Sequence, residues 1–250
     1  MAYGGGVSAN SFGANYNAGL FGAGGYVGLT MPGAYRLQFD LQGEGTGNYC
    51  AACKDRSQSM FAGHIDYRLD PRFDVGLFTG LQYARPTFGA PSDTNYFVGG
   101  EARYNGATWM TGLQGGYFDV SNGPGTLRNA WFIEWRGKFA LGNLFGPSNS
   151  FNPVLNGNYG YASGNLSTLP VGATTSQWGV GISQDIDAAA MTLFVGYHQF
   201  TNRVEGTGTV WNEHQIKGGV KFDLYPLPSN QPTLERALPL PYVLGAVTAF

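Results

Sequence analysis

Residues 216–226 read IKGGVKFDLYP, and apolar and polar positions alternate as far as Leu224. One side of an extended strand through them carries Ile216 and Phe222, and the other side carries Lys217 and Lys221. Because successive side chains of a β-strand point to opposite faces, such a strand separates an apolar medium from an aqueous one. The segment therefore predicts a strand whose two faces meet different solvents.

The composition favours a β-structure in a membrane. Charged residues make up 12% of the 250 residues, while the chain has 40 glycines and 15% aromatic residues; the usual charged share is about 25%. Mean hydropathy is −0.16, and no apolar run approaches the roughly 20 residues that a membrane helix needs. A transmembrane β-barrel fits, because its lipid-facing residues occupy alternate positions only. The alternative is a soluble β-sandwich or β-solenoid, which would usually carry more surface charge. The net charge of −2 gives no indication of nucleic-acid binding.

The same alternation recurs along the chain and predicts about twelve strands. Most are roughly 9–13 residues long, close to the length that a tilted strand needs to cross a bilayer. The expected strands span 3–12, 18–30, 34–44, 58–69, 73–84, 96–104, 107–119, 129–141, 153–163, 176–186, 189–200 and 216–224. Long connections are expected at 45–57, 85–95, 120–127, 164–175 and 201–212, with short turns and one medium connection, at 142–152, between them. Long external loops alternating with short periplasmic turns are typical of membrane barrels.

The first segment also reads polar-x-Gly-x-x-apolar-x-apolar through Lys217, Gly219, Phe222 and Leu224. This pattern resembles the closing-strand assembly signal of Gram-negative outer-membrane β-barrels (porin-like proteins). Together with the alternation, the loop asymmetry and the aromatic residues at strand ends, it makes residues 18–224 similar to that family in architecture. The resemblance implies an antiparallel up-and-down transmembrane β-barrel in the outer membrane. It also implies contact with membrane lipid and lipopolysaccharide, insertion by the barrel-assembly machinery, and an export signal removed ahead of Met1, a trimmed or engineered start.

Two regions are expected: a barrel over 1–225, with its first strand boundary open before 18, and a Pro-rich tail over 226–250. The tail ends in an apolar nonamer whose last residue, Phe250, could close a thirteenth segment instead. The closing strand at 216–224 is preferred because its polar face is charged. The tail could cross the periplasmic mouth, enter the lumen, bind a periplasmic partner or be disordered, and a homo-oligomer is open as well.

The polar faces of the strands are expected to line a lumen with seven acidic and seven basic side chains. These residues are Arg36, Asp40, Asp66, Arg68, Asp74, Glu101, Arg103, Glu134, Arg136, Lys138, Asp185, Lys217, Lys221 and Asp223. Barrels fill with side chains at about eight strands and open into wide channels at about 16–18, so twelve strands predict a narrow interior. Balanced charge leaves two alternatives: mutual pairing that closes the lumen, or a small polar pore with weak ion selectivity.

The same alternation predicts which apolar side chains face outward and which face inward. Large aromatic residues on the opposite faces of the strands are expected to meet lipid, among them Trp109, Trp131, Trp135 and Trp178. Phe78, Phe97 and Phe132 share the inward parity with the charged residues and could obstruct the lumen.

The two cysteines, Cys50 and Cys53, form a single CxxC in a long polar connection. In an oxidising compartment this spacing favours a disulfide that staples an extracellular loop. Free thiols and a metal site are the alternatives, and the absence of a second CxxC from the sequence weakens the metal interpretation. No cofactor is expected.

Sequence motifs for catalysis are weak. The three histidines, His64, His198 and His214, stand in no HxxxH or HxH spacing, and the chain has no GxSxG. Residues 43–48, GEGTGN, lack the following Lys-Ser/Thr of a phosphate-binding loop. The main hypothesis is a narrow porin-like channel for small polar solutes or ions and not an enzyme. One alternative is a non-conducting structural or receptor barrel that presents external loops to a partner, and a second is a lipid-modifying barrel enzyme.

Overall fold

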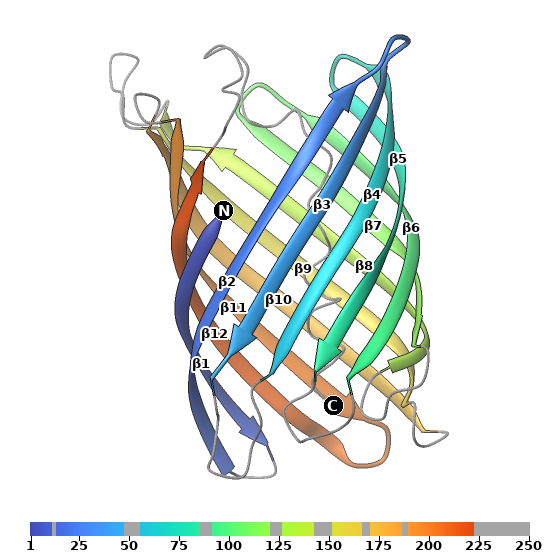
Figure 1. The fold of residues 1–250 in the computed structure, drawn as a ribbon, viewed down its shortest axis with the longest axis vertical. Coiled ribbons are helices and arrows are strands. Elements are labelled where there is room, and N and C mark those ends of the chain that lie inside the picture. Colours follow the sequence, from blue (N-terminus) through green and yellow to red (C-terminus); the bar gives the residue numbers. More distant parts are fainter. Residues whose placement is uncertain are drawn as a thin grey trace.

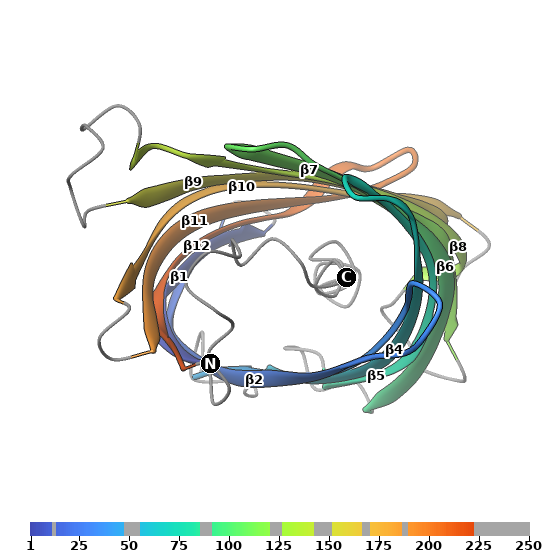
Figure 2. The same ribbon diagram turned by 90° about the horizontal axis from the view of Figure 1, so that it is seen from above.

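The computed structural model describes residues 1–11, 14–47, 56–85, 92–120, 127–142, 152–166, 171–186 and 190–222. Within these ranges twelve antiparallel strands form a closed barrel, seen from the side in Figure 1 and along its length in Figure 2. The strands are β1 (Ala2–Ser11), β2 (Ala14–Thr30), β3 (Tyr35–Thr46), β4 (Ser57–Asp70), β5 (Phe73–Arg85), β6 (Asp93–Asn105), β7 (Trp109–Val120), β8 (Leu127–Ala140), β9 (Pro153–Leu166), β10 (Gly172–Ile186), β11 (Met191–Val204) and β12 (Gly208–Phe222). No helix in the described part of the chain is long and apolar enough to cross a membrane.

Each strand pairs with its neighbours in the sequence, and β12 pairs with β1 to close the ring. The closing register runs from Ala2 opposite Val220 to Ser11 opposite Trp211. The expected all-β, up-and-down barrel of about twelve strands is therefore confirmed. The strand that closes it contains most of the segment 216–224, as its charged polar face predicts.

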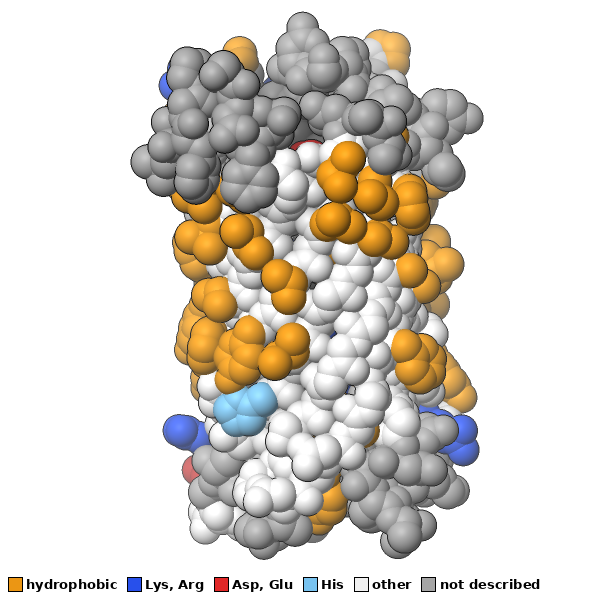
Figure 3. Space-filling view, turned by 90° about the vertical axis from the view of Figure 1, so that its left-hand side faces the viewer, with side chains coloured by type: hydrophobic (Ala, Val, Ile, Leu, Met, Phe, Trp, Pro, Cys, Tyr) orange, Lys and Arg blue, Asp and Glu red, His pale blue; other side chains and the backbone are white. Residues whose placement is uncertain are grey.

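The two faces of the wall differ as the alternation predicts. Trp109, Trp131, Trp135 and Trp178 lie on the outside with 41–52% of their surface exposed. Figure 3 shows hydrophobic side chains over the middle of one outer face and the charged side chains of that face toward its ends. Glu134 and Arg136, which alternate with the outward tryptophans of β8, are buried in the interior. The barrel thus exposes apolar side chains outward and buries polar ones inward.

The short connections have the residues that tight turns need. Gly33 and Ala34 between β2 and β3 both have positive φ, 84° and 68°, a conformation that glycine adopts most easily. The Asp70 carboxylate accepts hydrogen bonds from the backbone of Arg72 and Phe73 at 2.7 and 2.9 Å, which closes the β4–β5 turn. After Asn105 the Gly106 amide donates to the Trp109 carbonyl at 2.8 Å. These three turns lie at the same end of the barrel, called here the turn-side end, toward the top of Figure 1.

The expected strand ends needed correction at the β11–β12 connection. A long loop was predicted over 201–212, but β11 continues to Val204 and β12 begins at Gly208. Most side chains of 201–212 are polar, and the apolar Val204 and Trp211 do not fall on alternate positions of one face, so apolar alternation does not mark the segment as strand. Thr201 and Gln199 of β11 nevertheless donate to Asn212 Oδ1 of β12, at 3.3 and 3.2 Å.

Three features predicted from the sequence lie outside the described residues. They are the pair Cys50 and Cys53, the lumen residue Asp223, and the tail 226–250.

Candidate functional site

The candidate site is the interior wall of the barrel. Of the expected lumen residues, Asp40, Asp66, Asp74, Glu101, Arg103, Glu134, Arg136 and Lys217 are buried there. Arg36, Arg68, Lys138, Asp185 and Lys221 are half-buried. All five half-buried residues lie within two positions of the turn-side end of their strands. Charged groups therefore extend from the middle of the wall to that mouth.

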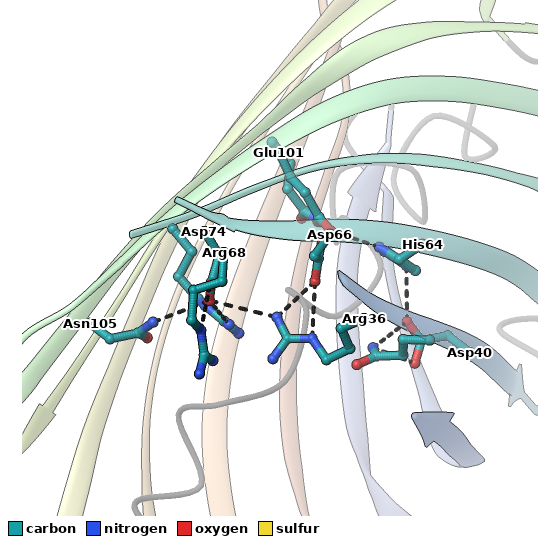
Figure 4. A network of polar contacts seen from close by, with 11 residues as sticks. Arg36, Asp40, His64, Asp66, Arg68, Asp74, Glu101 and Asn105 are labelled. Carbon is teal, nitrogen blue, oxygen red and sulfur yellow. Dashed lines mark hydrogen bonds and ion pairs between the residues drawn. The ribbon is translucent and has the colours of Figure 1, made fainter. Parts of the chain in front are cut away.

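Three arginines from β3, β4 and β6 meet at the turn-side end and are called here the arginine cluster: Arg36, Arg68 and Arg103. Figure 4 shows Arg36 and Arg68 of this cluster. Arg36 donates to Asp66 through Nη2 at 2.8 Å and lies 3.6 Å from Asp74. Arg68 Nε donates to the other Asp74 oxygen at 3.1 Å, and Arg103 also donates to Asp74. Register explains the meeting, because Arg36 is opposite Asp66, and Asp74 lies between Arg68 and Arg103.

The middle of the same wall holds a histidine between two carboxylates. His64 Nε2 lies 3.1 Å from Asp40, and its Nδ1 lies 3.0 Å from Glu101. The amides of Gln38 and Gln114 donate to these two carboxylates, at 3.0 and 2.7 Å. These contacts join side chains of β3, β4, β6 and β7 in one polar network, part of which is drawn in Figure 4.

Two ion pairs link β12 to the strands beyond β1 and β2, and they are called here the clasp. Lys217 Nζ lies 2.5 Å from Glu44 of β3, which also accepts the Tyr3 hydroxyl at 2.9 Å. Arg56, directly before β4, donates two hydrogen bonds to Glu213 of β12, at 2.7 and 2.8 Å. The four charged groups are all buried.

Sequence reasoning missed three of these four residues. Glu44 has the same parity as Arg36 and Asp40, and Glu213 has the same parity as Lys217, so extending the alternation would have found both. Arg56 likewise shares the parity of the inward residues of β4 but precedes the strand expected at 58–69.

Amide and hydroxyl groups replace charges on the wall from β9 to β11. Asn158 donates to Gln177 at 2.8 Å, and Thr175 donates to Asn202 at 2.8 Å. Among the residues that the structure describes in these strands, Asp185 and Arg203 are charged, and Arg203 is exposed. The interior therefore has a charged sector and a neutral polar sector.

An apolar cluster also faces inward, around Phe78, Phe97, Phe118 and Phe132. Phe78 lies between the rings of Phe97 and Phe132, with ring centroids 6.2 and 6.1 Å away, and its ring also stacks on His64 at 5.6 Å. The inward phenylalanines predicted from the sequence are therefore found, and they lie together beside the charged network.

The histidine side chains contact carboxylate, amide and phenol groups of other described residues. His64 meets carboxylates, His198 Nδ1 lies 3.4 Å from the Gln177 amide, and His214 contacts Tyr197 at 2.5 Å. None of these contacts places a serine hydroxyl against an imidazole, as nucleophilic catalysis requires. Within the described ranges, no group of three or more His, Cys, Asp or Glu side chains could hold a metal ion.

No protein-family model and no curated protein matches the sequence. Solved structures do match. The NanC porin is 10% identical with a TM-score of 0.55, covering 90% of this chain and 100% of its own. An outer-membrane channel from Pseudomonas putida F1 is 13% identical with a TM-score of 0.56, covering 88% of this chain and 94% of its own. The chain shares its fold with outer-membrane porins and channels. At these identities the likeness concerns the fold alone, and solute and residue roles must come from the site.

Proposed function

We propose that this chain is a channel in the outer membrane of a Gram-negative bacterium that passes small polar solutes or ions through its interior. The observation that carries the proposal is the division of the wall into an apolar outer face and a polar, charged inner face in a closed barrel. A closed barrel satisfies every backbone hydrogen bond within the sheet, as a hydrocarbon environment requires. The shared fold of the two matched channels supports the same conclusion.

The charged sector fits passage of polar solutes better than a purely structural interior. Both signs recur on single strands, as in Glu134 and Arg136, whose side chains are 2.6 Å apart. Opposite charges so close together cancel at a distance, so weak selectivity between cations and anions is expected. The neutral amide sector of β9 to β11 offers further hydrogen bonds without adding charge.

A second candidate is a non-conducting barrel that presents its loops to a partner. The clasp and the phenylalanine cluster favour it, because ion pairs and packed rings occupy interior space. A narrow barrel filled by its own side chains would then serve as a scaffold.

Liposome swelling distinguishes the two candidates. Vesicles containing the purified full-length chain are diluted into an isotonic solution of a neutral pentose, and light scattering is recorded. A channel lets the sugar enter, so the vesicles swell, and swelling should be slower with a disaccharide. Vesicles carrying heat-denatured protein are the control. Scattering indistinguishable from this control with both sugars would reject passage of neutral solutes and favour the scaffold.

A further inference from the structure

The arginine cluster has more hydrogen-bond donors than its carboxylates can accept. Each guanidinium carries five N–H donors, and the three arginines share Asp66 and Asp74. Arg103 Nε is buried without a hydrogen-bond partner. Arg68 contacts Asp74 through Nε alone among the described residues. Three guanidinium groups thus share two carboxylates within the cluster.

The cluster is open on one side. The side chain of Arg68 is 38% exposed, whereas those of Arg103, Asp66 and Asp74 are 4–5% exposed. Arg36 is 14% exposed and lies in the second position of β3, near the turn-side mouth. Buried members hold the arrangement in place, and Arg68 and Arg36 reach the space that a solute would enter. In Figure 4 the ends of both guanidinium groups point away from the strands that carry them.

We propose that the arginine cluster binds the carboxylate group of a solute at the turn-side end of the interior. A guanidinium presents its donors in a planar fork that matches two carboxylate oxygens, so Arg68 can bind such a group with two parallel hydrogen bonds. The Asp74 carboxylate already accepts hydrogen bonds from Arg68 and Arg103, so the guanidinium groups of the cluster are placed to bind a carboxylate. The site rests on the proposed channel, because it names the class of solute that would pass through the interior. That class is small organic acids.

Calorimetric titration of the full-length protein in detergent tests the site without requiring conduction. The ligand is succinate, and succinamide, the neutral diamide of the same shape, is the control. Succinate should bind and succinamide should not. Arg68→Gln should weaken succinate binding by about tenfold or more, because a charge-assisted hydrogen-bonded pair is lost. Arg72→Gln is the matched control: Arg72 is an exposed arginine in the adjoining turn, and its loss should leave binding unchanged.

A second variant should change affinity in the opposite direction. Asp74→Asn keeps the shape of the side chain but removes the charge that all three arginines share, so succinate should bind about threefold more tightly or better. Circular dichroism shows whether this variant keeps its β-structure. Equal binding of succinate and succinamide, or equal affinity in the parent and Arg68→Gln, would overturn the site. Either result can occur in a chain that still lets sugars pass, so failure of the site and failure of the channel are distinguishable.

Discussion

Glycine residues of this barrel occupy two different environments. A Cβ on the inward Gly116 would lie 2.2 Å from the Val98 carbonyl oxygen and 2.7 Å from Gly99 Cα. A Cβ on the outward Gly6 would have nothing within 4 Å. In the sequence both residues are simply glycines within a strand. The sequence alone therefore does not show that neighbouring atoms leave no room for a larger side chain at Gly116 but do leave room at Gly6.

Alanine at these two positions should therefore have opposite effects on the free energy of unfolding. Gly116→Ala forces backbone apart and should destabilise the barrel by about 1–3 kcal/mol. Gly6→Ala should stabilise it by roughly 0.5–1 kcal/mol, since glycine loses more conformational freedom on folding. Urea unfolding of the chain in lipid vesicles, followed by tryptophan fluorescence, measures both. Equal effects of the two changes would mean that the inward packing is not as tight as described.

A second prediction concerns the cost of placing a charge on the outward face of a strand. Leu77, 65% exposed, lies near the middle of β5, and Tyr83 lies toward its far end. If this face meets hydrocarbon, Leu77→Arg should cost about 2–4 kcal/mol of stability and Tyr83→Arg only about 0–1 kcal/mol. The same unfolding measurement in vesicles tests the difference. Two equal costs would argue that β5 does not cross a bilayer.

Among the strands, the clasp spans β1 and β2. Its two ion pairs join β12, on one side of these strands, to β3 and the start of β4 on the other side. Lys217 on β12 reaches Glu44 on β3, and Gly5 and Gly22 lie on the intervening strands in register with them. An inward Cβ at Gly5 would lie 1.8 Å from a backbone oxygen, and one at Gly22 would lie 2.2 Å from the Tyr3 ring. Small residues on the first two strands thus leave room for side chains that join the strands on either side.

Within the clasp, removing one member of the Lys217–Glu44 ion pair should destabilise the barrel more than removing both members. Glu44→Gln leaves the Lys217 ammonium buried without its carboxylate, which should cost about 3–5 kcal/mol. Adding Lys217→Met removes the uncompensated charge and should recover much of the loss. Urea midpoints of the parent, both single variants and the double variant give the coupling free energy. A double variant as unstable as the sum of the singles would show that the two groups do not act as a pair.

The sequence predicted the strands far better than it predicted their partners. Alternation places Arg136 inward and Trp135 outward because any slip of one residue would reverse every side chain. It fails where apolar residues do not keep to one face, as at 201–212. It places Arg36, Arg68 and Arg103 on the inward faces of their strands without showing that they share Asp74. That meeting depends on the register between neighbouring strands, which alternation within one strand does not determine.

At the scale of the whole molecule, charge is distributed unevenly around the interior. The arginine cluster, the His64 network and the Glu134–Arg136 pair lie on β3 to β8, and the clasp lies on and near β12, β3 and β4. The inward side of β9 to β11 is neutral apart from Asp185 near the turn-side end. The preference of a conducting barrel for cations or anions should therefore depend on a few ion pairs in the charged sector.

Neutralising single members of such a pair should shift ion selectivity in opposite directions. Glu134→Gln removes one negative charge beside Arg136 and should move the reversal potential toward anion preference. Arg136→Gln combined with Lys138→Gln should move it toward cation preference. The reversal potential is read across a bilayer with a salt gradient, and Arg203→Gln, on the exposed face, is the control. Two variants that match the parent in a conducting barrel would mean that these side chains do not line the pathway.

Single-channel current recording of the purified parent chain in a planar bilayer tests whether the barrel conducts through its interior. We expect discrete current steps, because ions can cross only through the polar interior of individual inserted barrels. The steps should be small, since the wall carries inward phenylalanines and paired charges as well as polar groups. A barrel that inserts, shown by protection of its strands from protease, and yet gives no current steps would contradict the claim.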